Sequence, residues 1–308
     1  MKNDLWLDLE LREDIDDYAT LIYAIENKYN IICLSINNPS IEEIKLFNYT
    51  IEKFDLNIPL IISGEITKYS DDKNLHPSLM ELIKDYDKVD YEHINVLPIN
   101  KLDLDNINHP LRYLYESRFV FVGGEIEAFP ITVFCGGSLT TLSILLDLFK
   151  DKNAIKAVIQ GGFVSYKIVA EKDLLKKFKK RDKVPTWNLN LDIEATKKVL
   201  ASNININFVS KNICHDSHVD LNDLGSNKSF FNTVLVNYFK DNKYKSKCLH
   251  DLLAFLSFNS DIVEFKKVDL LFTDDEIPKF WSELNDDSNI SISVAFSKYK
   301  FLDKVKNA

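Results

Sequence analysis

Residues 5–25 of the chain read LWLDLELREDIDDYATLIYAI, in which a group of acids separates two apolar runs. The run at 5–7 is typical of a buried strand, and the run at 18–25 is typical of a helix. Five of the six carboxylates between them are on Asp8, Glu10, Asp14, Asp16 and Asp17. So much negative charge where a strand meets a helix is costly unless a cation neutralises it or water solvates it. We therefore expect the chemistry of the protein at this join.

Short β-prone runs alternate with amphipathic helix-length segments along the chain. We expect strands at 5–7, 31–36, 60–62, 131–135, 157–159 and 206–209, and helices at 17–27, 40–54, 139–149 and 192–202. Ser40 with Glu43 is a capping signal at the start of the second helix. The alternation predicts an α/β fold, an open, mostly parallel Rossmann-like sheet with helices on both faces.

Composition limits the classes of function. The chain has 308 residues, 45% of them hydrophobic, without an internal repeat or a low-complexity linker, so we expect a single domain over residues 1–308. No run of 18 apolar residues is present and the start is polar, which favours a soluble, cytoplasmic protein without membrane partners. A net charge of -9 argues against nucleic acid as a partner. The four cysteines are far apart, as in reduced thiols, and zinc is not expected.

Polar loops follow several of the expected strands, at 8–17, 36–38, 136–140 and 161–163. In open α/β sheets, ligands bind beyond the carboxyl ends of the strands, where such loops converge. We therefore expect these four loops to line one site.

Several of these segments resemble motifs of the nucleoside hydrolases, in the order of that family. Residues 8–17 are similar to its D-x-D-x-x-x-D-x-D-D pattern, with Glu10 in place of an Asp and Arg12 in place of a Gly. Further similarities are 137–142 to G-P-L-T-N-L, 160–162 to M-G-G, 187–195 to F-N-x-x-x-D-P-E-A, 213–215 to V-T-H, 250–251 to a His-Asp pair, and 290–302 to the last strand and helix. The resemblance spans nearly the whole chain and implies that fold.

The resemblance also implies roles for individual residues. It assigns Ca²⁺ to the side chains of Glu10, Asp17 and Asp251 and the backbone carbonyl of Thr140, with Glu10 as the base that activates a Ca-bound water. It assigns the ribose to Asp16, Asn38 and Asn188, and the proton donor or steering group for the leaving base to His250. An Asn in a loop is also common as a turn residue, which is the alternative role for Asn38. His215 is a weaker candidate than His250 for contact with the leaving base.

The basic segment 163–186 departs from the family pattern. It is longer by roughly ten residues, holds eight Lys and Arg residues against three acids between 167 and 183, and has Thr186 where the family has a Glu that holds the ribose 5′-hydroxyl. One interpretation is a substrate with a 5′ substituent, because the segment loses a carboxylate and gains cations near the active site. The other is a surface insertion, a solvated helix face without a role in binding.

Three functions stay open at this point. The first is a Ca-dependent N-glycosidase that splits a ribonucleoside or a 5′-substituted riboside into base and ribose in nucleoside salvage. The second is a catalytically impaired protein of the same fold that binds metal and ribosides, since glutamate carries one methylene more than aspartate. The third is Mg²⁺-dependent phosphoryl transfer. The resemblance further implies a homo-oligomer, a dimer or a tetramer.

Overall fold

The first strand, β1 (Asp4–Leu9), sends alternate side chains to opposite faces of a sheet in the computed structural model of the chain. Leu5, Leu7 and Leu9 enter one buried cluster, and Trp6 enters the other. This is the period of two expected for a strand that is covered on both faces. The structure describes residues 4–11, 14–63, 75–86, 97–98, 119–122, 125–128, 130–149, 151–241, 245–258 and 261–308.

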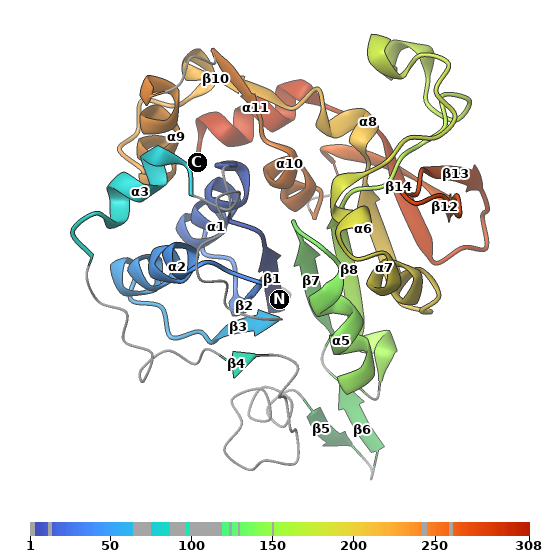
Figure 1. Ribbon diagram of the computed structural model, residues 1–308, viewed down its shortest axis with the longest axis horizontal. Coiled ribbons are helices and arrows are strands. Elements are labelled where there is room, and N and C mark those ends of the chain that lie inside the picture. The colour runs from blue at the N-terminus through green and yellow to red at the C-terminus, as the bar shows by residue number, and fades with distance from the viewer. Residues whose placement is uncertain are drawn as a thin grey trace.

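Within these residues the main sheet has ten strands, in the order β13-β12-β14-β9-β8-β7-β1-β2-β3-β4 (Figure 1). Its remaining members are β2 (Ile31–Asn37), β3 (Leu60–Ser63), β4 (Leu97–Pro98), β7 (Ile131–Cys135), β8 (Ile155–Gln160), β9 (Asn205–Val209), β12 (Val263–Phe272), β13 (Phe280–Leu284) and β14 (Ile290–Phe296). The pairs from β14 to β4 are parallel, and β12 pairs antiparallel with both β14 and β13.

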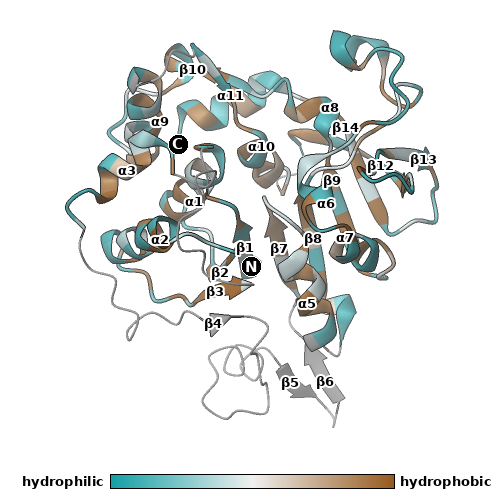
Figure 2. Cartoon of the chain, viewed as in Figure 1, coloured by the Kyte–Doolittle hydropathy of each residue, from teal (hydrophilic) through white to brown (hydrophobic). Residues whose placement is uncertain are grey.

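Helices cover both faces of this sheet. The helices are α1 (Asp16–Glu26), α2 (Ile41–Lys53), α3 (Pro77–Ile83), α5 (Thr140–Leu148), α6 (Trp187–Leu191), α7 (Ile193–Leu200), α8 (Lys211–Cys214), α9 (Phe230–Asp241), α10 (His250–Leu256) and α11 (Lys298–Lys306). Residues of α1, α2, α9, α10 and α11 share one core with β1, and residues of α5 and α7 share the other with β8 and β9. Figure 2 shows the hydrophobic colour concentrated on the strands and on helix sides that face them.

Smaller elements lie outside the main sheet. One two-stranded sheet pairs β10 (His218–Asp220) with β11 (Ser246–Cys248), and a second pairs β5 (Phe119–Val122) with β6 (Glu125–Ala128). Short 3-10 turns are η2 (Lys152–Ala154), η3 (Glu171–Asp173), η4 (Lys176–Phe178) and η5 (Leu221–Asp223).

The basic segment 163–186 forms the yellow-green excursion beside α8 at the upper right of Figure 1. It contains η3 and η4 and no α-helix, so its interpretation as a helix face is wrong. It is mostly hydrophilic (Figure 2), but Val169 and Phe178 are buried. The segment is therefore attached to the body by apolar contacts.

The strand order reverses beside β1. From β1 the chain proceeds outward through β2, β3 and β4, and it then returns to the other side of β1 with β7 and β8. A crevice at the carboxyl ends of the strands is expected where an open sheet reverses in this way. The acidic loop follows β1 and the loop of Gly136 follows β7, so both lie at this point.

All the strands and helices expected from the sequence are present, with boundaries within two residues. The predicted α/β class, with a mostly parallel sheet covered on both faces, is confirmed. Among the described residues, no helix combines the length and the apolar character needed to cross a membrane.

Candidate active site

A cavity of about 580 Å³ opens at the carboxyl ends of β1, β7 and β8. Its carboxylates come from the loop after β1, from the start of α1 and from α10. They are Glu10, Asp14, Asp16, Asp17 and Asp251. Strand order thus brings the predicted metal ligands at both ends of the chain to one place.

Asp17 and Asp251 converge beside Gly136 at the end of β7. A Cβ atom on Gly136 would lie 2.5 Å from Asp17 Oδ1 and 3.2 Å from Asp251 Oδ1, so a side chain there would displace both carboxylates. Asp17 Oδ1 accepts a hydrogen bond from the Glu10 backbone N–H at 3.1 Å. Asp251 Oδ1 is buried and has no hydrogen-bond partner within the described part of the chain. An unpartnered buried carboxylate oxygen is costly, which makes this corner suited to a cation.

Electrostatics point the same way. Burial, followed by repulsion from Asp14, raises the pKa of Asp16 to about 7. Burial and then repulsion from Asp16 raise the pKa of Asp17 well above its usual range, and burial and then repulsion from Asp17 do the same for the pKa of Asp251. A bound cation would remove this penalty, because opposite charge favours the ionised form of each carboxyl group.

The donors here are oxygens, which suit Ca²⁺ or Mg²⁺ better than Zn²⁺. No group of three or more His, Cys, Asp or Glu side chains in the described part of the chain is arranged to hold a metal by itself. A metal at Asp17 and Asp251 would therefore need further oxygens from the backbone, water or a sugar. Such mixed ligand sets are ordinary for Ca²⁺.

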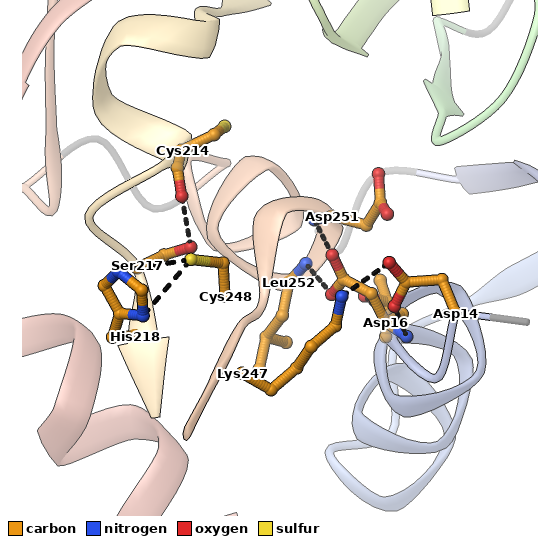
Figure 3. A network of polar contacts seen from close by, with 10 residues as sticks. Asp14, Asp16, Cys214, Ser217, His218, Lys247, Cys248, Asp251 and Leu252 are labelled. Carbon is orange, nitrogen blue, oxygen red and sulfur yellow. Dashed lines mark hydrogen bonds and ion pairs between the residues drawn. The ribbon is translucent and has the colours of Figure 1, made fainter. Parts of the chain in front are cut away.

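Asp16 supports α10. Its carboxylate accepts the backbone N–H groups of Asp251 at 2.9 Å and Leu252 at 3.4 Å, as Figure 3 shows. The residue before α10, Leu249, offers no side-chain cap, so Asp16 supplies the missing acceptor from another element. Asp16 lines the cavity, as expected of a ribose ligand, but its carboxylate is already engaged in holding Asp251 in place.

Two further carboxylates of the opening motif, Asp8 and Asp14, support the loop. Asp8 Oδ1 accepts the Ser35 hydroxyl at 2.6 Å, and Asp14 Oδ1 accepts the Asp16 backbone N–H at 3.0 Å. Asp14 also forms an ion pair with Lys247 at 2.5 Å (Figure 3). The loop after β1 is thus fixed at both ends, whereas Arg12 lies outside the described residues.

Asn188 joins the ends of two strands. Its Nδ2 lies 2.7 Å from the Gly136 carbonyl oxygen, 3.0 Å from the Gln160 carbonyl oxygen and 2.8 Å from Gln160 Oε1. Asn188 lines the cavity, and no hydrogen bond among the described residues uses its Oδ1 atom. That oxygen is available to accept a ligand hydroxyl.

Two predicted site residues do not line the cavity. Asn38 has a φ of 45° and donates its backbone N–H to Ser63, which is the geometry of a turn residue. Thr140 begins α5, and its carbonyl accepts the Ser143 hydroxyl at 2.8 Å. Helix carbonyls point along the axis away from the N-terminus, so the Thr140 oxygen is directed away from the strand ends. Gly136 supplies the cavity with a residue from the same loop.

His250 and His215 form a pair of rings on one wall, with centroids 5.0 Å apart. The Nε2 atom of His250 is buried, without a hydrogen-bond partner among the residues that the structure describes. Burial, followed by the charges of neighbouring His and Lys residues, lowers the pKa of His250 to about 3 and that of His215 to about 4. Both imidazoles are neutral near pH 7. His250 therefore offers a hydrogen bond, and it becomes a proton donor only if a ligand raises its pKa.

Three residues that line the cavity had no individual role predicted from the sequence. Gly136 contributes backbone, which no side-chain pattern reveals. Trp187 is 70% exposed and precedes Asn188 in a motif that had been noted for its Asn. Lys211 lies just after the carboxyl end of β9. Ligands of open α/β sheets bind beyond the carboxyl ends of the strands, so this position indicates a residue of the site.

Comparison with known proteins identifies the fold. No protein-family model and no curated protein matches the sequence. A plant nucleoside hydrolase, PpNRh1, matches with a TM-score of 0.65 at 15% identity over 100% of this chain and 98% of that chain. An inosine-uridine preferring nucleoside hydrolase from Bacillus anthracis matches with a TM-score of 0.65 at 14% identity, over 98% and 97%.

The type III effector protein XopQ, solved in complex with adenosine diphosphate ribose, matches with a TM-score of 0.58 at 11% identity, over 99% of this chain and 92% of that chain. The chain therefore has the fold of the nucleoside hydrolases. The resemblance drawn from the sequence motifs is confirmed at the level of the fold.

Proposed function

We propose that the chain hydrolyses the N-glycosidic bond of a ribonucleoside or a 5′-substituted riboside, giving the base and a ribose that keeps any 5′ substituent. The observation that carries this proposal is the convergence of Asp17 and Asp251 beside Gly136, with one buried carboxylate oxygen unpartnered. It occurs at the reversal of strand order in a fold shared with nucleoside hydrolases.

We propose Ca²⁺ as the cofactor, held by the carboxylates of Glu10, Asp17 and Asp251. The resemblance implied the Thr140 carbonyl as a further ligand; the Gly136 carbonyl is the better candidate, because Gly136 adjoins both Asp17 and Asp251. When bound, Ca²⁺ would supply charge that lowers the pKa of a coordinated water and orients the ribose hydroxyls.

The protein groups have separate tasks in this proposal. Glu10 accepts a proton from the attacking water. A Cβ atom on Gly137 would lie 3.1 Å from Glu10 Cβ, so the glycine leaves room for the Glu10 side chain. Asn188 accepts a ribose hydroxyl through Oδ1. His250 offers its buried imidazole to the departing base as a neutral hydrogen-bonding group.

A second candidate is a catalytically impaired protein that binds metal and ribosides. Glu10 favours it, because one additional methylene moves a base by more than about 1 Å and misalignment of that size costs rate. The complex of XopQ with adenosine diphosphate ribose supports a riboside with a 5′ substituent as ligand under either candidate. We further propose a cytoplasmic homo-oligomer, a dimer or a tetramer, acting in nucleoside salvage.

Release of reducing sugar from nucleosides, 5′-nucleotides and NAD, with Ca²⁺ and with a chelator, tests the proposal. We expect release only with Ca²⁺, and a loss of about 100-fold or more in Asp17→Asn. Asp287→Asn, an exposed carboxylate outside the cavity, is the matched control and should behave as wild type. Absence of release from every substrate would favour the second candidate, and equal release by Asp17→Asn would remove the metal from the mechanism.

A further inference from the structure

The rim of the cavity carries positive charge, although its floor is acidic and the chain has a net charge of -9. Lys211 lines the cavity and donates to the Pro185 carbonyl at 3.0 Å. Neither Lys211 nor Lys177 takes part in any of the ion pairs found among the described residues. Two uncompensated ammonium groups at the mouth of a cavity are suited to an anionic ligand.

The basic segment holds Lys177 near this rim. Phe178 is buried, and its ring lies 5.3 Å from Phe163 and 5.7 Å from His215, which itself lines the cavity. The Lys177 ammonium lies 5.2 Å from the centre of the Phe178 ring. The nearby charge of Lys177 adds to burial in lowering the pKa of Lys211, so the two cations act on each other. The segment is therefore part of the wall around the site.

Two further side chains line this wall, those of Thr186 and Trp187. Thr186 is 2% exposed, and its buried hydroxyl has no hydrogen-bond partner among the described residues. Trp187 presents a mostly exposed ring on the same wall. A buried hydroxyl without a partner costs free energy that a ligand oxygen would recover. No carboxylate stands at position 186 to repel an anion.

We infer that this end of the cavity binds a phosphate on the 5′ oxygen of the ribose, with Lys211 and the Thr186 hydroxyl in contact and Lys177 adding charge. The inference rests on the riboside-binding function proposed above. With the sugar hydroxyls toward Asp17 and Asp251, a phosphate on the 5′ oxygen is favoured beside Lys211, because opposite charges attract strongly in a site of low dielectric. The substrate class is then a riboside 5′-phosphate.

Binding of ribose 5-phosphate and of ribose, measured by calorimetry on the whole protein with Ca²⁺, tests the phosphate site without a base and without catalysis. We expect ribose 5-phosphate to bind at least about tenfold more tightly than ribose. Lys211→Met removes the charge but keeps the aliphatic stem. In this variant the ratio of the two affinities, ribose 5-phosphate over ribose, should fall to about two or less. Lys183→Met is the matched control, because Lys183 is exposed and faces the Trp281 ring at 5.6 Å.

The ratio in Lys183→Met should equal that of wild type. Equal binding of the two sugars by wild type, or an unchanged ratio in Lys211→Met, would overturn the phosphate site. Sugar release is measured separately. If the protein prefers ribose 5-phosphate but releases no sugar, the proposed hydrolase activity is contradicted and the phosphate site is supported. If it releases sugar from nucleosides but does not prefer ribose 5-phosphate, the hydrolase is supported and the phosphate site is contradicted.

Discussion

The two histidines of the cavity wall illustrate how position decides protonation. The His215 ring lies 5.7 Å from the Phe178 ring and 5.0 Å from the His250 ring. Burial is the largest cause of its lowered pKa, followed by the charges of Lys177 and Lys211. A cationic rim thus keeps the imidazoles neutral, and a neutral His250 can hydrogen-bond a departing base without repelling the cation proposed at the floor.

The lowered pKa of His215 has a measurable effect on the free energy of unfolding. An unfolded His takes up a proton near pH 6.5, whereas folded His215 does so only near pH 4, so its contribution is complete above pH 6.5 and is lost as the pH falls toward 4. His215→Phe keeps the ring contacts and removes the titration. Urea unfolding with a chelator should show that the variant loses about 1 kcal/mol less than wild type between pH 7 and pH 4.5, after allowance for partial exposure. Identical losses would contradict the assignment.

Among the elements, α2 shows most directly how the sequence encodes a boundary. The Ser40 hydroxyl accepts the Glu43 N–H at 3.2 Å, and the Glu43 carboxylate accepts the Ser40 N–H at 2.6 Å. Ser40→Ala should lower the free energy of unfolding by about 1 kcal/mol, since the buried N–H of Glu43 loses its acceptor. Chemical denaturation measures this, with the exposed Ser226→Ala as control. Equal stability of the two variants would show that the cap contributes nothing.

Local patterns explain why the elements were predictable and some loop residues were not. A cap or an alternating apolar run depends on neighbours in sequence, so the boundaries were within two residues. The position of Asn38 outside the cavity depends instead on its positive φ and on the hydrogen bond from its backbone N–H to the Ser63 carbonyl. The position of Thr140 likewise depends on the tertiary structure, which puts it in the first turn of α5 with its carbonyl directed into the helix. Backbone donors and acceptors such as those of Gly136 leave no signature in side-chain patterns.

At the scale of the whole molecule, the cavity joins segments that are distant in sequence. Asp16 and Asp251 are 235 residues apart, yet one accepts the other's backbone N–H. The order of strands, with β1 between β2 and β7, creates this meeting point. Periodicity predicts that parallel strands form a sheet but not their order, so the motif order of a known family was needed to expect the meeting. A ligand that bridges these segments stabilises the fold as a unit.

Calcium should therefore raise the thermal stability of the whole chain. At about 100 times its dissociation constant, a ligand of the folded state alone adds about 2.7 kcal/mol. For a protein of this size that corresponds to a rise in Tm of about 5 °C or more in differential scanning calorimetry. Asp251→Asn should remove this rise, because the variant loses a ligand.

The same substitution should make the calcium-free protein more stable, since it removes a buried carboxyl group whose ionised form is opposed by burial and by Asp17. Asp287→Asn, whose side chain is exposed, should keep both the wild-type Tm and the rise with Ca²⁺. A full Ca²⁺ effect in Asp251→Asn would place the cation elsewhere. A calcium-free Tm below that of wild type would mean that Asp251 stabilises the fold by contacts of its own, and the cluster would then not be a strained site that a cation relieves.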